Sequence, residues 1–266
     1  MGVKPTVLKL GGSVITDKNK PSTANVDAID RLADEISSAK VSSLILVHGG
    51  GSFGHPIAKK YNLTEGYGDP SQVIGFSETH RAMTKLNNFV MEALFSHNIN
   101  AVVVQPSSCV LTTGGRIQSM EQKPIERMLD MGLVPVLFGD AVLDSEKGFA
   151  ILSGDQLVSS LAITFGASRI IMGGDVDGLY TADPKVNASA KLIERVTLEE
   201  LKNQKHEIEG SKAIDDVTGG MLGKMRELIP AIEKNIQTLI VNATKPLRVY
   251  KALREEEVVG TIIKKR

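Results

Sequence analysis

Residues 48–55 of this chain read HGGGSFGH, and the other motifs can be placed around them. The stretch follows Ser43–Val47, an apolar run that predicts a buried parallel strand. Pro56 comes directly after it and suits the first turn of a helix. Three consecutive glycines remove every Cβ from the connection, so backbone N–H groups can approach an anion at a helix N-terminus. The sequence therefore predicts an anion cradle bracketed by His48 and His55.

Composition excludes several classes of protein. The chain has 266 residues, enough to bury a large core in one compact domain with two lobes. Lys+Arg and Asp+Glu both number 31, so no global field attracts nucleic acid or an anionic membrane. No apolar run approaches membrane-spanning length, and no signal region precedes the first strand. The single cysteine, Cys109, excludes an intrachain disulfide, and we expect a soluble protein of the reducing cytoplasm.

Short apolar runs alternate with amphipathic segments along the chain. Strands are expected at Thr6–Leu10, Ser43–Val47, Ala101–Gln105, Val134–Phe138, Arg169–Met172 and Thr238–Val241. Helices are expected at Val26–Ala39, Ser77–His97, Ile125–Met131, Gln156–Phe165, Leu198–Lys202 and Met221–Lys234. No linker, low-complexity tract or internal repeat interrupts this order. The alternation predicts an α/β fold whose parallel sheet carries helices on both faces.

The glycine stretch also matches a dinucleotide-binding fingerprint. Gly49, Gly51 and Gly54 follow G-x-G-x-x-G after a strand, and Asp69 lies at about the distance expected of a ribose-binding acid. Asp69, however, stands in the sequence GYGDP, which predicts a turn and not the tip of a second strand. A dehydrogenase is therefore a weak alternative. A plain turn is another, but it needs only one or two glycines.

Three lysines are candidates to neutralise phosphate. Lys9 interrupts a strand that is otherwise apolar, and a lysine in such a place usually has a partner. Lys18 follows the turn Gly11–Ser13, and Lys224 follows Gly219–Gly223. The last motif is not a P-loop, because its spacing differs and a methionine stands where serine or threonine would reach magnesium.

Aspartates mark two further turns. Ser153–Asp155 precedes the helix expected from Gln156, and residues 173–184 read GGDVDGLYTADP after a predicted strand. An EF-hand would require glycine at Tyr180 and glutamate at Val186, so a calcium loop is excluded. At the carboxyl end of a parallel strand, this loop is better placed to hold a nucleotide.

Together these motifs resemble those of the amino acid kinase superfamily. The similarity covers almost the whole chain and follows the superfamily's order, through Lys9–Ser13, His48–Gly51, Gly154–Asp155, Asp175–Tyr180 and Gly219–Lys224. Within the superfamily, Val14–Lys18 and Ser52–His55 are similar to the isopentenyl phosphate kinases. In that family, the histidine matching His55 binds the phosphate of the acceptor. Relatives that phosphorylate a carboxylate, a carbamate or UMP lack this loop ending.

The resemblance implies a fold, a reaction and partners. The fold would be an open αβα sandwich with a mainly parallel central sheet, one domain over residues 1–266. Residues 1–168 would bind the acceptor and residues 169–266 the nucleotide. The reaction would be ATP-dependent phosphorylation of isopentenyl phosphate to isopentenyl diphosphate, a step of isoprenoid biosynthesis by the alternative mevalonate pathway, with Mg²⁺ accompanying ATP. Relatives resemble homodimers built through the first lobe.

The resemblance also implies roles for individual residues. Catalytic roles fall to Lys9, Lys18, Lys224, Asp155 and His55. The acceptor's phosphate and the transferred group would lie against Gly49, Gly50, His55 and Gly154. The nucleotide would contact Lys9, Gly11, Gly12, Ser13, Gly51, Asp175, Tyr180, Gly219 and Lys224. This set is chemically coherent, because phosphoryl transfer needs positioning and charge neutralisation, and an ionised phosphate acceptor needs no strong base.

The acceptor's tail separates the remaining alternatives. Phe76 and Met83 would suit a five-carbon alkenyl chain, although an apolar stripe at helical spacing is more often plain core. A fosfomycin-type phosphonate kinase is the alternative enzyme, since its acceptor also presents a phosphorus oxyanion. A nucleotide-binding storage or sensor protein on the same fold is the alternative outside enzymes. The presence of all three lysines and of Asp155 weighs against it.

Overall fold

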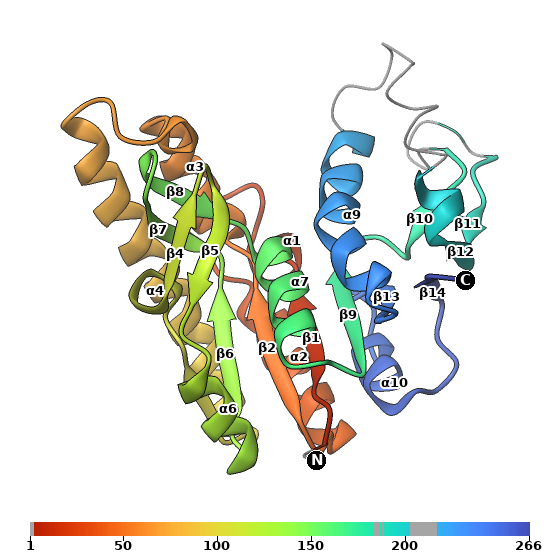
Figure 1. Cartoon of the computed structure of the whole chain (residues 1–266). Helices are drawn as coiled ribbons and strands as arrows, with labels where there is room; N and C mark the ends of the chain where they lie inside the picture. The colour runs from red at the N-terminus through yellow and green to blue at the C-terminus, as the bar shows by residue number, and fades with distance from the viewer. Residues whose placement is uncertain (1–2, 183–186, 188, 203–216) are drawn as a thin grey trace.

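The computed structural model describes residues 3–182, 187, 189–202 and 217–266, and in the last range it describes side chains from residue 223. Within these residues an eight-stranded sheet forms the centre of the molecule (Figure 1). All neighbouring strands in it are parallel except β13 and β14. In spatial order the strands are β12 (Arg195–Thr197), β14 (Gly260–Lys264), β13 (Gln237–Asn242), β9 (Arg169–Gly174), β1 (Thr6–Leu10), β2 (Leu44–His48), β6 (Val134–Phe138) and β3 (Ala101–Val103).

Helices cover both faces of this sheet, as the α/β pattern predicts. Helices α1, α2, α4 and α10 share one hydrophobic cluster with the strands, and α6, α7 and α9 share the other. The helices are α1 (Gly12–Ile15), α2 (Val26–Ala39), α3 (Gly51–Lys60), α4 (Ser71–Ser96), α5 (Pro106–Cys109), α6 (Lys123–Asp130), α7 (Gly154–Thr164), α9 (Val217–Glu233) and α10 (Arg248–Arg254), with a 3₁₀ turn η1 (Leu63–Glu65). Residues 198–202 are also helical, as expected.

A four-stranded sheet was not predicted. It stands beyond β6 in the order β5 (Arg116–Met120), β4 (Val110–Thr113), β7 (Asp140–Asp144) and β8 (Gly148–Leu152), and Gly139 alone separates β6 from β7 (Figure 1). A further two-stranded ribbon joins β10 (Leu179–Tyr180) to β11 (Leu192–Ile193). These strands are short and mix polar with apolar residues, so they lack the periodicity that identifies a buried strand.

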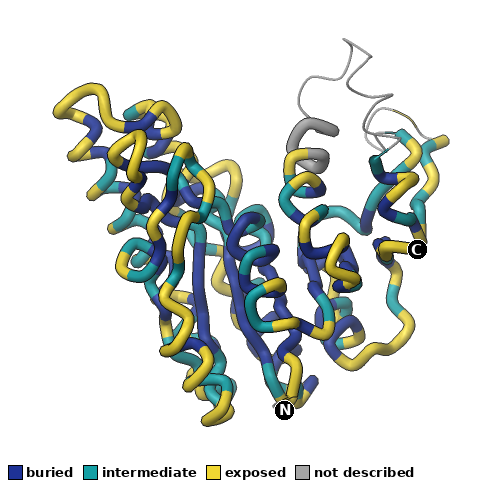
Figure 2. The backbone as a smooth tube through the Cα atoms, viewed as in Figure 1, coloured by how far each residue is buried: buried dark blue, intermediate teal, exposed yellow. Residues whose placement is uncertain are grey.

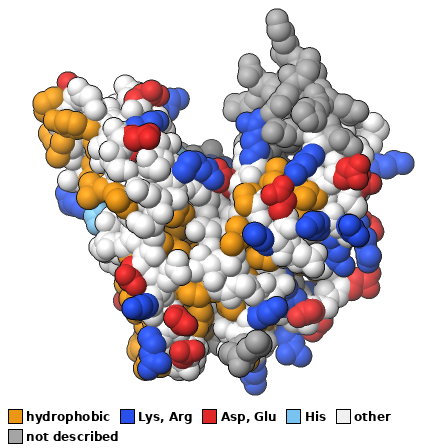
Figure 3. Space-filling view, in the orientation of Figure 1, with side chains coloured by type: hydrophobic (Ala, Val, Ile, Leu, Met, Phe, Trp, Pro, Cys, Tyr) orange, Lys and Arg blue, Asp and Glu red, His pale blue; other side chains and the backbone are white. Residues whose placement is uncertain are grey.

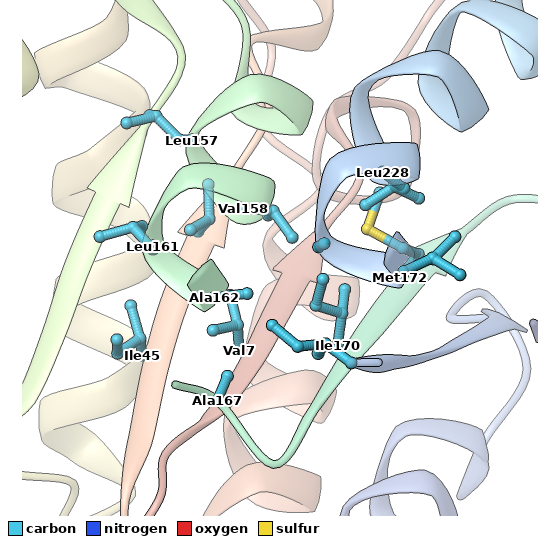
Figure 4. Packing of buried hydrophobic residues seen from close by; sticks show 14 of the residues in the cluster. Val7, Ile45, Leu157, Val158, Leu161, Ala162, Ala167, Ile170, Met172 and Leu228 are labelled. Atoms are coloured by element: carbon cyan, nitrogen blue, oxygen red, sulfur yellow. The ribbon is translucent and has the colours of Figure 1, made fainter. Parts of the chain in front are cut away.

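Side chains alternate across the faces of β1, and this alternation places a lysine near the carboxyl end of the strand. Val7 packs against α7, beside Val158 and Ala162 (Figure 4). Leu8 packs in the opposite cluster, with α2 and α4. Lys9 therefore projects on the same side as Val7, toward the start of α7. The central strands are the most buried part of the molecule (Figure 2), so the side chain of Lys9 projects from an apolar part of the sheet.

Several predicted boundaries are wrong, among them the start of α9, which begins at Val217 and not at Met221. Helix α3 already begins at Gly51, so Pro56 lies inside the helix and not in its first turn. Proline cannot donate to the carbonyl of Ser52, and that carbonyl instead accepts a hydrogen bond from the N–H of Ser22 at 3.0 Å. Helix α4 begins at Ser71, before the expected Ser77. The strand expected at Ala101–Gln105 ends at Val103.

A buried carboxylate ties α2 to α10. Glu35 is 3% exposed and accepts hydrogen bonds of 3.0 Å from the backbone N–H groups of Leu247, Val249 and Tyr250. These donors lie at or just before the first turn of α10, where backbone N–H groups have no partner within the helix. Arg31, one turn earlier on α2, pairs with the same carboxylate. Glu35 thus caps a helix that lies 212 residues away along the chain.

Replacing this carboxylate should lower stability. Glu35→Gln removes the negative charge that faces the start of α10 but keeps one accepting oxygen. We therefore expect the free energy of unfolding to fall by about 1 to 2 kcal/mol, within the range for unsatisfied buried groups. Urea unfolding measures this loss. Asp34→Ala on the same helix is the control, because that side chain is 65% exposed and its removal should change stability by under about 0.5 kcal/mol. Equal losses in the two variants would contradict the capping role.

No helix among the described residues has the length and apolarity needed to cross a membrane.

Candidate active site

A cavity of about 870 Å³ opens at the carboxyl ends of β1, β2 and β6. Ligands of parallel α/β sheets commonly bind at this edge. The lining comes from the turns after these strands, from α3 and α4, from the start of α7, and from α9. In the space-filling view the molecule is hollowed between the part that carries α4 and the part that carries α9 (Figure 3).

The floor of the cavity is made by two glycine turns in backbone contact. A Cβ on Gly12 would lie 2.2 Å from the nitrogen of Gly51, so no larger residue fits there. Gly51 itself has a φ of +47°, and a Cβ on it would meet the hydroxyl of Thr16 at 2.1 Å. That hydroxyl donates to the carbonyl of Gly12 and accepts from the N–H of Ser52. The glycine stretch thus joins the turn after β1 to the turn after β2, and its use as an anion cradle stays a prediction.

Lys9 and Asp155 form an ion pair at the cavity wall. The ammonium lies 2.5 Å from Oδ1 of Asp155, and the two side chains are only 8% and 14% exposed. Burial lowers the pKa of Lys9, the carboxylate of Asp155 opposes that shift, and the nearby charge of Lys224 adds to it. Asp155 lies in the first turn of α7, whose N-cap Ser153 accepts from the N–H of Gln156. Gly154 packs closely here, because a Cβ on it would lie 3.3 Å from Cε of Lys9.

The two histidines of the opening stretch have different environments. His48 is fully buried, bonds to Asn87 at 3.2 Å and stacks on Phe138, and burial lowers its pKa to about 4. It is therefore a neutral core residue, and the expectation that it brackets the cradle is wrong. His55 lines the cavity. Burial lowers its pKa, the charge of Lys9 lowers it further, and Asp155 opposes the shift.

The predicted nucleotide contacts fall into three groups. Lys9, Gly11, Gly12, Ser13, Gly51 and Lys224 all line the cavity, together with Lys18, Gly49, Gly50 and Gly154. Asp175 and Tyr180 do not line it. Gly219 lies in α9, in the turns whose side-chain surroundings fall outside the described residues.

Asp175 joins the turn after β9 to the turn after β1. Its carboxylate pairs with Lys18 and accepts a hydrogen bond from Ser13, and these contacts lower its pKa against the opposing effect of burial. Lys18 is 56% exposed, so this pair lies at the mouth of the cavity. Tyr180 donates its hydroxyl to Oδ2 of Asp177 at 3.3 Å.

The two candidates for the acceptor's tail also differ. Met83 lines the cavity, and its sulfur lies 3.0 Å and 2.9 Å from the positions that a Cβ on Gly50 and on Gly54 would take. Phe76 does not line the cavity. Its ring packs on Phe149, with 5.6 Å between centroids, in a separate small cluster.

Comparison with known proteins identifies the family. The pattern of the amino acid kinase family matches residues 4–242. The isopentenyl phosphate kinase of Methanothermobacter thermautotrophicus is 41% identical over 265 residues, which cover 97% of this chain and 98% of that protein. The chain belongs to the isopentenyl phosphate kinases of the amino acid kinase family. The enzyme of the same name from Methanocaldococcus jannaschii is 40% identical over 272 residues, with 97% and 98% of the two chains covered.

Solved structures of isopentenyl phosphate kinases have the same fold. One, described as X-ray structures of isopentenyl phosphate kinase, has a TM-score of 0.85 at 38% identity and covers 98% of this chain and all of that chain. A second, described as a substrate complex, has a TM-score of 0.80 at 28% identity, with 97% and 100% covered. The predicted fold class and the resemblance drawn from the motifs are both confirmed.

Sequence reasoning missed two carboxylates of this kinase that line the cavity. Asp140 directly follows the Gly139 turn after β6, and its carboxylate lies 3.0 Å from Nδ1 of His80. Desolvation raises the pKa of Asp140, and His80 opposes the shift. Glu227 lies on α9, three residues beyond Lys224. Glu227 lies on a helix that the sequence predicts, whereas Asp140 begins β7 of the unpredicted sheet. The distant partners that hold both carboxylates cannot be recognised in the sequence.

The two residues predicted to contact the acceptor's tail, Phe76 and Met83, give a testable contrast. Met83→Ala removes a side chain that lines the cavity beside the glycine turn, so use of longer prenyl phosphates should improve relative to isopentenyl phosphate, by about tenfold. Phe76→Ala should leave that ratio unchanged and lower stability instead, because its ring packs on Phe149 and does not line the cavity. Competition assays between two chain lengths measure the ratio. A shift in Phe76→Ala and none in Met83→Ala would reverse the assignment.

Proposed function

We propose that this chain phosphorylates isopentenyl phosphate with ATP, giving isopentenyl diphosphate and ADP. One observation carries the proposal: Lys9, Lys224 and His55 meet at one cavity whose floor is glycine backbone. That arrangement provides positive charge, a neutral hydrogen-bond donor and close approach to glycine backbone for a polyanionic reaction. The identity to named isopentenyl phosphate kinases, at 41% and 40%, supports the choice of acceptor.

The reaction needs no general base. An oxygen of the acceptor's phosphate attacks the γ-phosphorus of ATP, and the bond from that phosphorus to the β–γ bridging oxygen breaks. We assign the acceptor's phosphate to His55 and the glycine turn, and the transferred group to Lys9 and Lys224. Asp155 holds the ammonium of Lys9 in place. Lys18 is assigned to the mouth of the site, where it would exchange Asp175 for phosphate.

We propose that Mg²⁺ enters together with ATP. Among the described residues no group of three His, Cys, Asp or Glu side chains forms a metal site. The residues present therefore fit an ion that would be held mainly by the phosphates of the nucleotide, which is common for Mg²⁺. Asp155 also lines the cavity, but its carboxylate is paired with Lys9. Such an ion would supply positive charge near the phosphates of ATP.

The division of labour between the two parts of the chain is also proposed. Residues 1–168 would hold the acceptor and residues 169–266 the nucleotide, with Asp175, Tyr180 and Gly219 in contact with ATP. We propose a homodimer through the first part, because α4 exposes Phe95 at 79% and the edge strand β3 exposes Val103 at 42%. A cytoplasmic location is proposed from the single cysteine.

An acceptor survey tests the function. The purified chain is incubated with MgATP and isopentenyl phosphate, fosfomycin or UMP, and ³¹P NMR follows the new diphosphate signal. We expect isopentenyl phosphate to have the highest kcat/KM. Faster turnover of fosfomycin would favour the phosphonate kinase, and nucleotide binding without turnover of any acceptor would favour a storage or sensor protein.

A further inference from the structure

An ion pair at the rim of the cavity joins the unpredicted sheet to α9. Arg116, the first residue of β5, donates from both terminal nitrogens to both carboxylate oxygens of Glu227, at 2.6 Å and 2.8 Å. The pair spans 111 residues of sequence. The side chain of Glu227 is 22% exposed and that of Arg116 is 59% exposed. A two-pronged pair of this kind fixes the direction of the carboxylate as well as its charge.

The structure holds the backbone of Arg116 in place independently of Glu227. The turn before it contains Gly114 and Gly115, whose N–H groups donate to the buried carboxylate of Asp144 at 3.2 Å and 2.7 Å. On its other side, the N–H of Ile117 donates to Oε1 of Gln156, and Nε2 of Gln156 donates to the carbonyl of Gly115. Gln156 is 8% exposed and follows Asp155 in α7. The backbone that carries Arg116 is thus anchored to the helix that begins the active site.

Glu227 is an unfavourable residue for a site that receives several phosphate groups. It lies three residues after Lys224 on the same helix, the spacing at which side chains of a helix are neighbours and opposite charges pair. If it were free to turn, its carboxylate would compete with phosphate for the ammonium of Lys224. Within the described part of the chain, no ion pair joins Lys224 to a carboxylate. The charge of its ammonium lowers the pKa values of Lys9 and His55.

We propose that Arg116 is a positioning residue that holds the carboxylate of Glu227 away from Lys224, so that the lysine stays available to phosphate. The inference rests on the proposed function for the role of Lys224. A different account would make the pair a simple tether between β5 and α9. The two accounts predict different effects for removing the charge of Glu227. If the pair is a tether, the loss of either partner should weaken binding. If Arg116 shields Lys224, its loss should matter only while Glu227 carries its charge.

The experiment compares four variants by the dissociation constant of Mg²⁺ with a non-hydrolysable ATP analogue, and by kcat. Arg116→Ala should weaken analogue binding and lower kcat by about three- to tenfold, less than the loss of a whole charged hydrogen bond. Glu227→Gln should change both by less than about twofold. The double variant Arg116→Ala/Glu227→Gln should recover to within about twofold of Glu227→Gln. Arg116→Lys, which keeps the charge but not the two-pronged geometry, should lie between wild type and Arg116→Ala.

Lys202→Ala is the matched control. Lys202, in the helical segment 198–202, pairs with Glu233 at the end of α9 at 2.6 Å. Neither residue of this exposed pair lines the cavity, and its loss should leave analogue affinity unchanged. Equal losses in Arg116→Ala and Glu227→Gln, with no recovery in the double variant, would establish the tether and overturn the shield. If the recovery appears in analogue binding but the wild type does not phosphorylate isopentenyl phosphate, the inference stands and the proposed function fails.

Discussion

Lys9→Ala should lower kcat by about 100- to 1,000-fold, the typical loss when one preorganised donor to a transition state is removed. The side chain of Lys9 projects from strand β1 of the central sheet, and its ammonium lies 2.5 Å from Asp155, so it is fixed before any substrate binds. Because this donor needs no reorganisation, it can stabilise the negative charge that is redistributed in the transition state of phosphoryl transfer. We therefore expect kcat to fall more than KM rises for either substrate, as measured by steady-state kinetics.

Folding has to be separated from catalysis in this test. Removing Lys9 leaves the carboxylate of Asp155 without its partner at a site where the side chain is only 14% exposed, so some loss of stability is expected. Lys9→Met keeps most of the side-chain volume, and thermal unfolding of both variants reports the stability. Comparable kcat losses in Lys9→Ala and Lys9→Met, with both proteins folded, would support a catalytic role. A near-normal kcat in Lys9→Met would remove it.

The other lysines should follow in an order set by their contacts. Lys224 lies close enough to Lys9 and His55 to influence the pKa values of both, so Lys224→Ala should also lower kcat more than it raises KM. Lys18 is 56% exposed and pairs with Asp175 at the mouth, so its loss should be the smallest of the three.

The sequence predicted those features of the site that local pattern determines. Each main motif stands where a strand ends or a helix begins, and parallel strands bring their carboxyl ends to one edge. Lys9 was recognisable because a charge interrupts an apolar strand. The glycine turns were recognisable because two backbones can approach so closely only where no Cβ is present. The central strands and most helices were predicted for the same reason, since their periodicity is strong.

Features that depend on distant partners were beyond sequence reasoning. Nothing local distinguishes His48 from His55. The side chain of His48 is nevertheless buried in the core, where it bonds to Asn87 and stacks on Phe138. The two-pronged pair of Arg116 with Glu227 needs a sheet whose short strands carry no clear period. Phe76 and Met83 lie on one helix, and only their neighbours show which of the two lines the cavity.

His55→Ala should lower kcat/KM for isopentenyl phosphate by about 10- to 150-fold, the equivalent of 1.5 to 3 kcal/mol for a hydrogen bond to a charged group. Affinity for an ATP analogue should stay nearly intact, because the residue is assigned to the acceptor. His55→Gln keeps a neutral N–H donor and should lose less. His97→Ala is the control, since that histidine pairs with Asp30 on the surface and its removal should not change kcat/KM.

The protonation state of His55 sharpens this test. Burial and the charge of Lys9 hold its pKa below the usual value of 6.5, so the imidazole of the free enzyme is neutral at pH 7 and remains neutral as the pH rises. Because kcat/KM reports the free enzyme, the ratio between wild type and His55→Gln should be constant from pH 7 to about 8.5. A ratio that grew steadily as pH fell from 8.5 to 7 would mean that an imidazolium binds the acceptor. An unchanged kcat/KM in His55→Ala would remove the residue from the acceptor site, and with it the main structural reason for choosing a phosphate acceptor.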